Sequence, residues 1–186
     1  MDSGRRVYLN GNYVKESDAK ISIFDSALMF GDMVFEMTRS FNKKTFKLDK
    51  HIERLLYGVK IYEIPLKKSA KELKEICLQT IELNEPFFNE TDEHRLMINV
   101  SRGPLGLYAP IFDYKLEPTV VVADFPLKWT VSYMGQLYDE GINAVLVNQR
   151  AMPSHLMDPK IKSRSRVFYQ MANIEASKFK GKNNWA

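Results

Sequence analysis

The sequence has one cysteine, three histidines and no long apolar run. A single cysteine, Cys77, excludes a disulfide within the chain and is typical of a reducing compartment. No cysteine and histidine have the spacing of a zinc site, so we expect no metal. No apolar stretch approaches the ~20 residues of a membrane helix, and the N-terminal segment lacks the apolar core of a secretory signal. These absences favour a cytoplasmic protein without a membrane partner.

The sequence also lacks a strong excess of charge. The 27 Lys and Arg residues against 23 Asp and Glu give a net charge of +4, and stretches such as "KKSAKELKEI" mix both signs, as solvated helix faces do. Cations gather only at Lys160, Lys162, Arg164 and Arg166. This cluster leaves two hypotheses other than an enzyme: an RNA-binding module, or a non-catalytic relative of an enzyme that binds a partner. The apolar helix predicted directly after these cations argues against RNA, because that helix is expected to bury its face.

The hydrophobic pattern predicts an α/β (α+β) fold. Asn10-Gly11 between two β-prone runs predicts a hairpin, and Ser69 with Glu72 forms a capping box ahead of a helix. Asp49 is the expected N-cap of an earlier helix. The remaining expected elements are strands at 20–24, 34–41, 95–101, 118–125 and 142–149, a turn at 42–43, and helices over 49–64 and after 166.

The stretch "FPLKW" is the expected linker between two domains. Residues 1–124 are predicted to form an N-terminal two-layer α/β domain, residues 125–129 the linker, and residues 130–186 the first part of a C-terminal α/β domain. One strand and one helix do not close a core. We therefore expect a further segment or a partner to complete the second domain.

Lys162 lies directly before the last predicted helix, in "DPKIKSRSRVFYQMANIEA". Nearby cations disfavour a protonated amine, and Arg164 and Arg166 are close in sequence. Only a neutral amine attacks a carbonyl, so this surrounding suits Schiff-base chemistry. By spacing alone, a surface lysine at a helix start is the more common explanation.

Two blocks of the sequence resemble the class IV pyridoxal-phosphate aminotransferases. The first block holds the Asn-Gly hairpin, Asp25, Gly31, Phe35-Glu36 and "HIERL". In the second block, Lys162 is followed thirteen positions later by Glu175-Ala176. The resemblance spans essentially the whole chain and implies the fold-type IV architecture, with pyridoxal 5'-phosphate (PLP) in a cleft between two domains. It also implies a homodimer.

The resemblance implies roles for individual residues. Lys162 matches the lysine that bonds PLP and then moves a proton, and Arg54 matches the arginine that contacts the cofactor phosphate. The positions that match substrate neighbours are Phe30, Phe35, Glu36, Arg95 and Tyr108, the last in a loop that often reaches the other subunit. A helix-surface ion pair is the alternative for Arg54, core packing for Phe35 and a structural ion pair for Arg95.

The implied reaction is amino-group transfer between an amino acid and a 2-oxo acid. Branched-chain or other apolar substrates are favoured, because Leu107 and Ala109 stand where D-specific members carry a carboxylate-binding Arg and His. Aminodeoxychorismate lyase, which releases pyruvate, is the alternative within the family. In the family, the region beyond "NNWA" binds the PLP ring and phosphate, so we expect these residues to belong to a longer protein and to bind PLP weakly alone.

Overall fold

The computed structural model describes residues 4–112 and 115–186, which form two compact units. The first unit comprises the chain up to Leu127 together with Lys160–Ser165, and the second comprises Lys128–Pro159 with Arg166–Ala186. Residues 160–165 thus pack with the first unit, whereas the sequence pattern grouped them with the second. No helix in the described ranges is long and apolar enough to cross a membrane.

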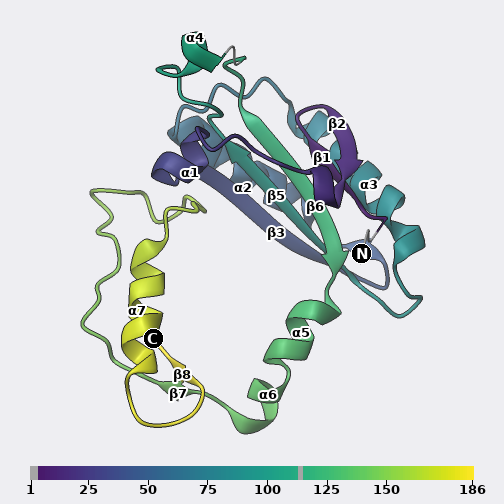
Figure 1. Cartoon of the computed structure of the whole chain (residues 1–186). Coiled ribbons are helices and arrows are strands. Elements are labelled where there is room, and N and C mark those ends of the chain that lie inside the picture. The colour runs from purple at the N-terminus through teal and green to yellow at the C-terminus, as the bar shows by residue number, and fades with distance from the viewer. Residues whose placement is uncertain (1–3, 113–114) are drawn as a thin grey trace. The chain divides into compact units, whose positions relative to one another are not determined.

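The first unit is built on a six-stranded sheet of order β2-β1-β6-β5-β3-β4 (Figure 1). Its elements are β1 (Arg6–Leu9), β2 (Asn12–Lys15), η1 (Glu16–Asp18), α1 (Ser26–Phe30), β3 (Met33–Phe41), β4 (Lys44–Thr45), α2 (Leu48–Ile61), α3 (Ala70–Asn84), η2 (Glu85–Phe87), β5 (His94–Ser101), α4 (Ala109–Phe112) and β6 (Thr119–Pro126). The ladders that join β1, β6, β5 and β3 are antiparallel. Helices α2 and α3 pack against one face of this sheet.

Both predicted hairpins are confirmed, and one predicted strand is wrong. Positive φ angles of 47° at Asn10 and 101° at Gly11 turn β1 into β2, and two further positive φ angles at 42–43 turn β3 into β4. The predicted strand at 20–24 is a loop instead. Its Phe24 carbonyl accepts a hydrogen bond from Leu105 N at 3.0 Å, so the segment binds another loop and has no strand to pair with.

The helix starts follow the sequence signals only in part. The capping box of α3 is confirmed, because Glu72 N donates to Ser69 Oγ at 3.2 Å and Ser69 N donates to Glu72 Oε2 at 2.7 Å. The predicted N-cap of α2 is wrong. Lys47, in the left-handed region, takes that position, and Asp49 lies in the first turn, where it pairs with Lys74 of α3 at 2.8 Å.

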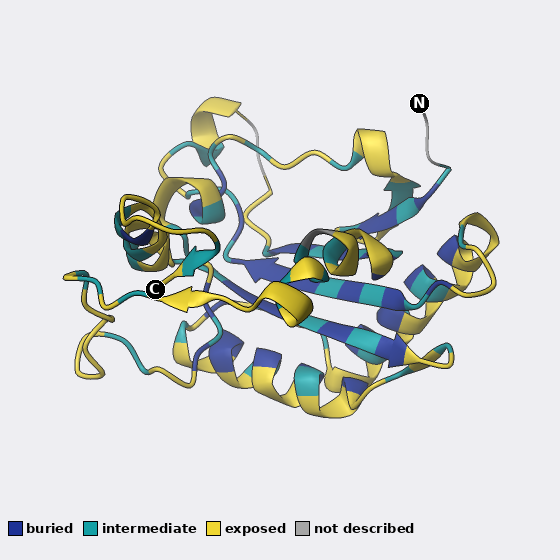
Figure 2. Ribbon diagram, turned by 90° about the horizontal axis from the view of Figure 1, so that it is seen from below, coloured by how far each residue is buried: buried dark blue, intermediate teal, exposed yellow. Residues whose placement is uncertain are grey.

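Strand alternation gives the sheet two different faces, which Figure 2 shows as alternating dark and lighter bands along the strands. The helix-covered face carries the core, in which apolar side chains of β3, β5 and β6 meet Ile52, Leu55 and Val59 of α2. We call the other side the opposite face. Its side chains, by register, are Met33, Phe35, Met37, Arg39, Arg95, Met97, Asn99, Ser101, Thr119, Val121, Ala123 and Phe125.

The second unit contains α5 (Lys128–Met134), α6 (Gln136–Glu140), β7 (Asn143–Ala144), α7 (Val167–Ser177) and β8 (Asn184–Trp185). The strand predicted at 142–149 is reduced to two residues, which pair with β8. Beyond them, Leu146 is 98% exposed, and Glu175 of α7 holds the chain by accepting a hydrogen bond from Asn148 N at 2.8 Å. The predicted helix after 166 is confirmed as α7. Its apolar side chains Val167 and Met171 are exposed, contrary to expectation.

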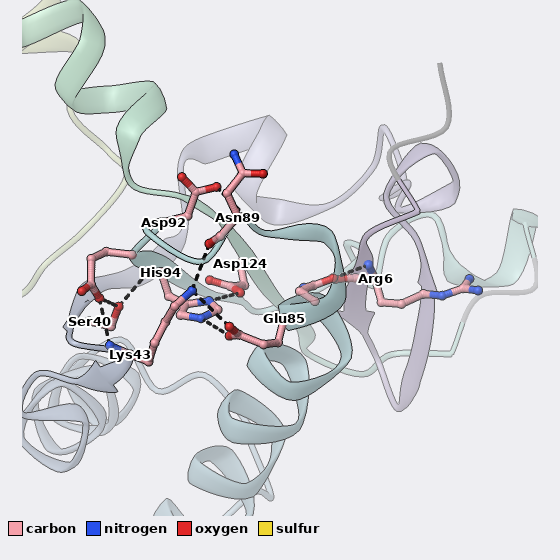
Figure 3. A network of polar contacts seen from close by, with 10 residues as sticks. Arg6, Ser40, Lys43, Glu85, Asn89, Asp92, His94 and Asp124 are labelled. Carbon is pink, nitrogen blue, oxygen red and sulfur yellow. Dashed lines mark hydrogen bonds and ion pairs between the residues drawn. The ribbon is translucent and has the colours of Figure 1, made fainter.

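A buried histidine connects three segments at one end of the central strands. Figure 3 shows His94 between two carboxylates: its Nδ1 lies 2.8 Å from Asp124 Oδ2 and its Nε2 lies 2.6 Å from Glu85 Oε2. Lys43 reaches Glu85 at 3.0 Å and adds positive charge to the cluster. Burial disfavours protonation of His94, but the hydrogen bonds and charges of Asp124 and Glu85 outweigh it and raise the pKa of the imidazole.

The raised pKa of His94 makes part of the stability pH-dependent. Such a histidine contributes stability that is fully present below its unfolded pKa of about 6.5 and is lost as the pH rises through the folded value. We expect the free energy of unfolding, measured by urea denaturation, to fall in the wild type as the pH rises through the folded pKa of His94. In His94→Gln this free energy should change less with pH. Parallel profiles for the two proteins would contradict the assignment.

Candidate active site

Residues Lys160–Ser165 pair with the free edge of β3 through an isolated antiparallel bridge between Val34 and Ser163, although more than a hundred residues separate the two segments in sequence. We call this segment the added strand. Phe35 N donates a hydrogen bond to the carbonyl of Lys162 at 2.9 Å, and Arg164 N donates to the carbonyl of Met33 at 2.9 Å. On this edge β4 pairs only with the far end of β3. The near end is therefore available to receive the lysine segment.

Residues of this added strand alternate between the two faces. Ile161 is 7% exposed and belongs to the core cluster, and Ser163 is also buried. Helix α2 comes close here because it carries Gly58, whose missing Cβ would stand 3.5 Å from Ile161 Cγ2. Since Ile161 and Ser163 face the helices, Lys162 and Arg164 project to the opposite face.

The side chains of Lys162 and Arg164 share one aromatic ring. Lys162 Nζ lies 4.7 Å from the centre of the Phe35 ring, and Arg164 Cζ lies 3.7 Å from it. Arg164 also donates to Asn99 Oδ1, from Nε at 3.3 Å and from Nη2 at 3.2 Å. The amine of a half-buried Lys162 is thus held against the sheet by a cation–π contact.

Glu36, next to Phe35, points to the helix-covered face and is 0% exposed. Its carboxylate accepts hydrogen bonds from Arg54 through Nε and, at 2.8 Å, through Nη2, and lies 2.7 Å from His51 Nδ1. Burial alone would raise the pKa of Glu36, but the hydrogen bonds from Arg54 and His51 outweigh it and lower the pKa. Glu36 is therefore a buried carboxylate that orients Arg54.

The two predicted functional cations contact neighbouring residues of β3 from its two different faces. Lys162 contacts Phe35, and Arg54 contacts the next residue, Glu36. The Arg54 side chain is half exposed, and its Nη1 donors take no part in the pair with Glu36. The strand edge thus offers an amine that can react with a carbonyl and a guanidinium that can bind an anion such as phosphate.

A hollow of about 350 Å³ lies on the opposite face beside Arg164. Its lining is mostly apolar and comes from β1, β3, β5, β6, the loop before α1 and the added strand. The lining residues are Leu9, Ala19, Ile21, Met33, Asn99, Thr119, Val121 and Arg164. Such a space suits a small apolar group attached to a charged or polar head.

The remaining predicted site residues are Arg95, Phe30 and Tyr108. Arg95 lies on the opposite face, in register with Arg39, with its Nη2 3.9 Å from Met37 Sδ. Phe30 ends α1 and is 70% exposed, and Tyr108 packs on Phe24 with ring centres 4.6 Å apart.

Glu36 was predicted beside the substrate. In the structure both of its oxygens are engaged beneath α2, by Arg54 and His51. Arg164 was predicted only as a charge close to Lys162. Residues two apart in an extended segment project to the same side, and this signal would have placed Arg164 on the face of Lys162.

Comparison with known proteins agrees with this geometry. Residues 33–184 match the family described as Amino-transferase class IV. A candidate branched-chain-amino-acid aminotransferase of Methanocaldococcus jannaschii is 32% identical over 173 residues, which cover 92% of this chain and 56% of the relative. An aminodeoxychorismate lyase of Bacillus subtilis is 34% identical over 117 residues, 62% of this chain and 38% of the relative.

Solved structures share the fold. The branched-chain aminotransferase of Thermoproteus uzoniensis, determined with norvaline, superposes with a TM-score of 0.72 and 26% identity, covering 93% of this chain and 56% of that chain. The present chain therefore spans about half the length of the relatives that it matches. The family match over residues 33–184 includes β3, β5, β6, α2 and the lysine segment.

Proposed function

Because the chain belongs to the class IV aminotransferase family, we propose that the protein containing it transfers an amino group between an amino acid and a 2-oxo acid. The observation that carries this proposal is the placement of Lys162 and Arg54 at one dipeptide of β3. Members of the family use PLP, which when bound supplies a carbonyl that condenses with amines and a ring that accepts the electrons of a carbanion.

The residues of this chain suit that cofactor. Lys162 would supply the amine that holds the cofactor and, with substrate bound, would move a proton at the substrate α-carbon. Arg54 would hold the phosphate, because Glu36 fixes its guanidinium through Nε and Nη2 and leaves Nη1 out of this pair. The Phe35 ring fixes the position of the amine and excludes water from one side of it.

An apolar amino acid is the substrate that the opposite face supports best. The hollow beside Arg164 is lined largely by apolar side chains, so it favours an aliphatic group over a polar one. Leu107 and Ala109 supply no charge for a D-specific carboxylate site. The lyase alternative rests on the similarity to aminodeoxychorismate lyase and differs in its product.

The first test is an assay on the natural protein that contains these residues. With PLP, L-leucine and 2-oxoglutarate we expect glutamate to form, and Lys162→Ala to abolish its formation because no other amine takes the place of Lys162. Lys160→Ala, two positions away, is the matched control and should retain activity. Pyruvate release from aminodeoxychorismate without an acceptor would support the lyase instead, and activity in Lys162→Ala would contradict the assignment.

A second test asks whether Glu36 supports binding of the cofactor phosphate or of the cofactor ring. Glu36→Gln keeps the shape of the side chain but removes the charge that holds Arg54. We expect the variant to bind PLP about tenfold more weakly, since a charged hydrogen bond contributes roughly 1.5–3 kcal/mol, and to bind phosphate-free pyridoxal nearly as well as the wild type. Glu53→Gln, on the exposed side of α2, is the control. An equal loss for both ligands would mean that Glu36 supports only the fold.

A homodimer is part of the proposal. The loops 20–30 and 103–112 join through a hydrogen bond from Ser26 N to Gly103 O at 2.9 Å and expose Ile23, Leu107 and Ile111. Exposed apolar side chains gathered on joined loops support an interface. Sedimentation of the natural protein at the mass of one chain would contradict this part.

A further inference from the structure

Arg164 and Lys162 lie on the same face of the sheet. Both side chains project from the added strand to the opposite face and pack on the Phe35 ring, so their cationic groups are separated by no more than the sum of their distances to that ring. Arg164 also borders the apolar hollow. The amine, the guanidinium and the hollow therefore follow one another along the same surface.

The charged side chains that β3, β5 and β6 direct to the opposite face are of one sign. The side chains of the opposite face include Arg39 and Arg95 but no acidic residue among the described parts of β3, β5 and β6. The carboxylates on these strands, Glu36 and Asp124, are buried on the helix-covered face. Asp25, which accepts hydrogen bonds from Ser101 Oγ at 2.7 Å and Thr119 Oγ1 at 2.5 Å on this face, is buried and engaged by both hydroxyl groups. An anion that enters beside Arg164 therefore meets the cations of these strands first.

We propose that Arg164 binds the carboxylate of the substrate while the adjoining hollow receives the aliphatic side chain. The inference rests on the proposed function and names its ligand class, a short carboxylate with an apolar tail. A guanidinium is suited to this task because its planar fork matches a carboxylate. Stacking on Phe35 and the hydrogen bonds to Asn99 hold the plane of the fork, so little side-chain freedom is lost when the ligand binds.

The alternative is that Arg164 only staples the added strand to the sheet through Phe35 and Asn99. Binding of an acid and its neutral amide distinguishes the two roles. The ligands are 4-methylpentanoate and 4-methylpentanamide, measured by calorimetry on the natural protein. The variants are Arg164→Gln, Arg164→Lys and, as a control of equal charge change outside the added strand, Arg166→Gln.

We expect Arg164→Gln to weaken binding of the acid about tenfold or more and to leave binding of the amide within about twofold. Arg164→Lys should lie between, because it keeps the charge and loses the fork. Arg166→Gln should match the wild type. If Arg164→Gln leaves the acid unaffected, or weakens acid and amide equally, the inference is wrong.

The measurement needs no turnover, so its failure is distinct from failure of the proposed function. A wild type that transaminates leucine while Arg164→Gln binds the acid normally would overturn the role of Arg164 alone. A wild type that is inactive but binds the acid through Arg164 would overturn the reaction and leave the carboxylate site in place. Thermal unfolding of each variant shows whether it is folded, and Arg164→Lys serves if the glutamine variant is not.

Discussion

The account depends on one interaction, the pairing of the lysine segment with the edge of β3. Two backbone hydrogen bonds, from Phe35 N to Lys162 O and from Arg164 N to Met33 O, set the register, and burial of Ile161 under α2 sets which side faces the core. Without this pairing, Lys162 would be a surface amine on a connecting segment. With it, the amine and the guanidinium two residues later are directed to one face by the same alternation that directs the strands.

Strand β3 directs different functional groups to its two faces. Phe35 presents its ring to the opposite face, where Lys162 and Arg164 lie, and Glu36 presents its carboxylate to the helices, where it fixes Arg54. Because the acidic group is buried on the far side, it orients one cation without neutralising the others. A buried, fully engaged carboxylate is costly to leave unpaired, which explains why Glu36 binds two partners.

Local signals in the sequence predicted much of the fold. The features that depend on contacts between separate segments were not predicted. The Asn10-Gly11 hairpin and the Ser69–Glu72 capping box form as predicted because each is completed within a few residues. The strand expected at 20–24 failed because alternating Ile21 and Ile23 have no facing strand. Lys162 and Arg54 were identified by resemblance. The sequence did not reveal that Glu36 would be buried, because α2 covers it in three dimensions. Nor did it reveal that Arg164 would share the Phe35 ring, because that contact follows from a pairing between distant segments.

Amide hydrogen exchange of the natural protein tests this pairing most directly. The N–H groups of Phe35 and Arg164 are predicted to exchange slowly, like those inside β3 and β5, because each donates to the partner segment. The two should also become unprotected together when Ile161 is replaced by alanine. If both amides exchange as fast as those of an exposed loop in the wild type, the lysine is not held at this edge and the account of the site is wrong.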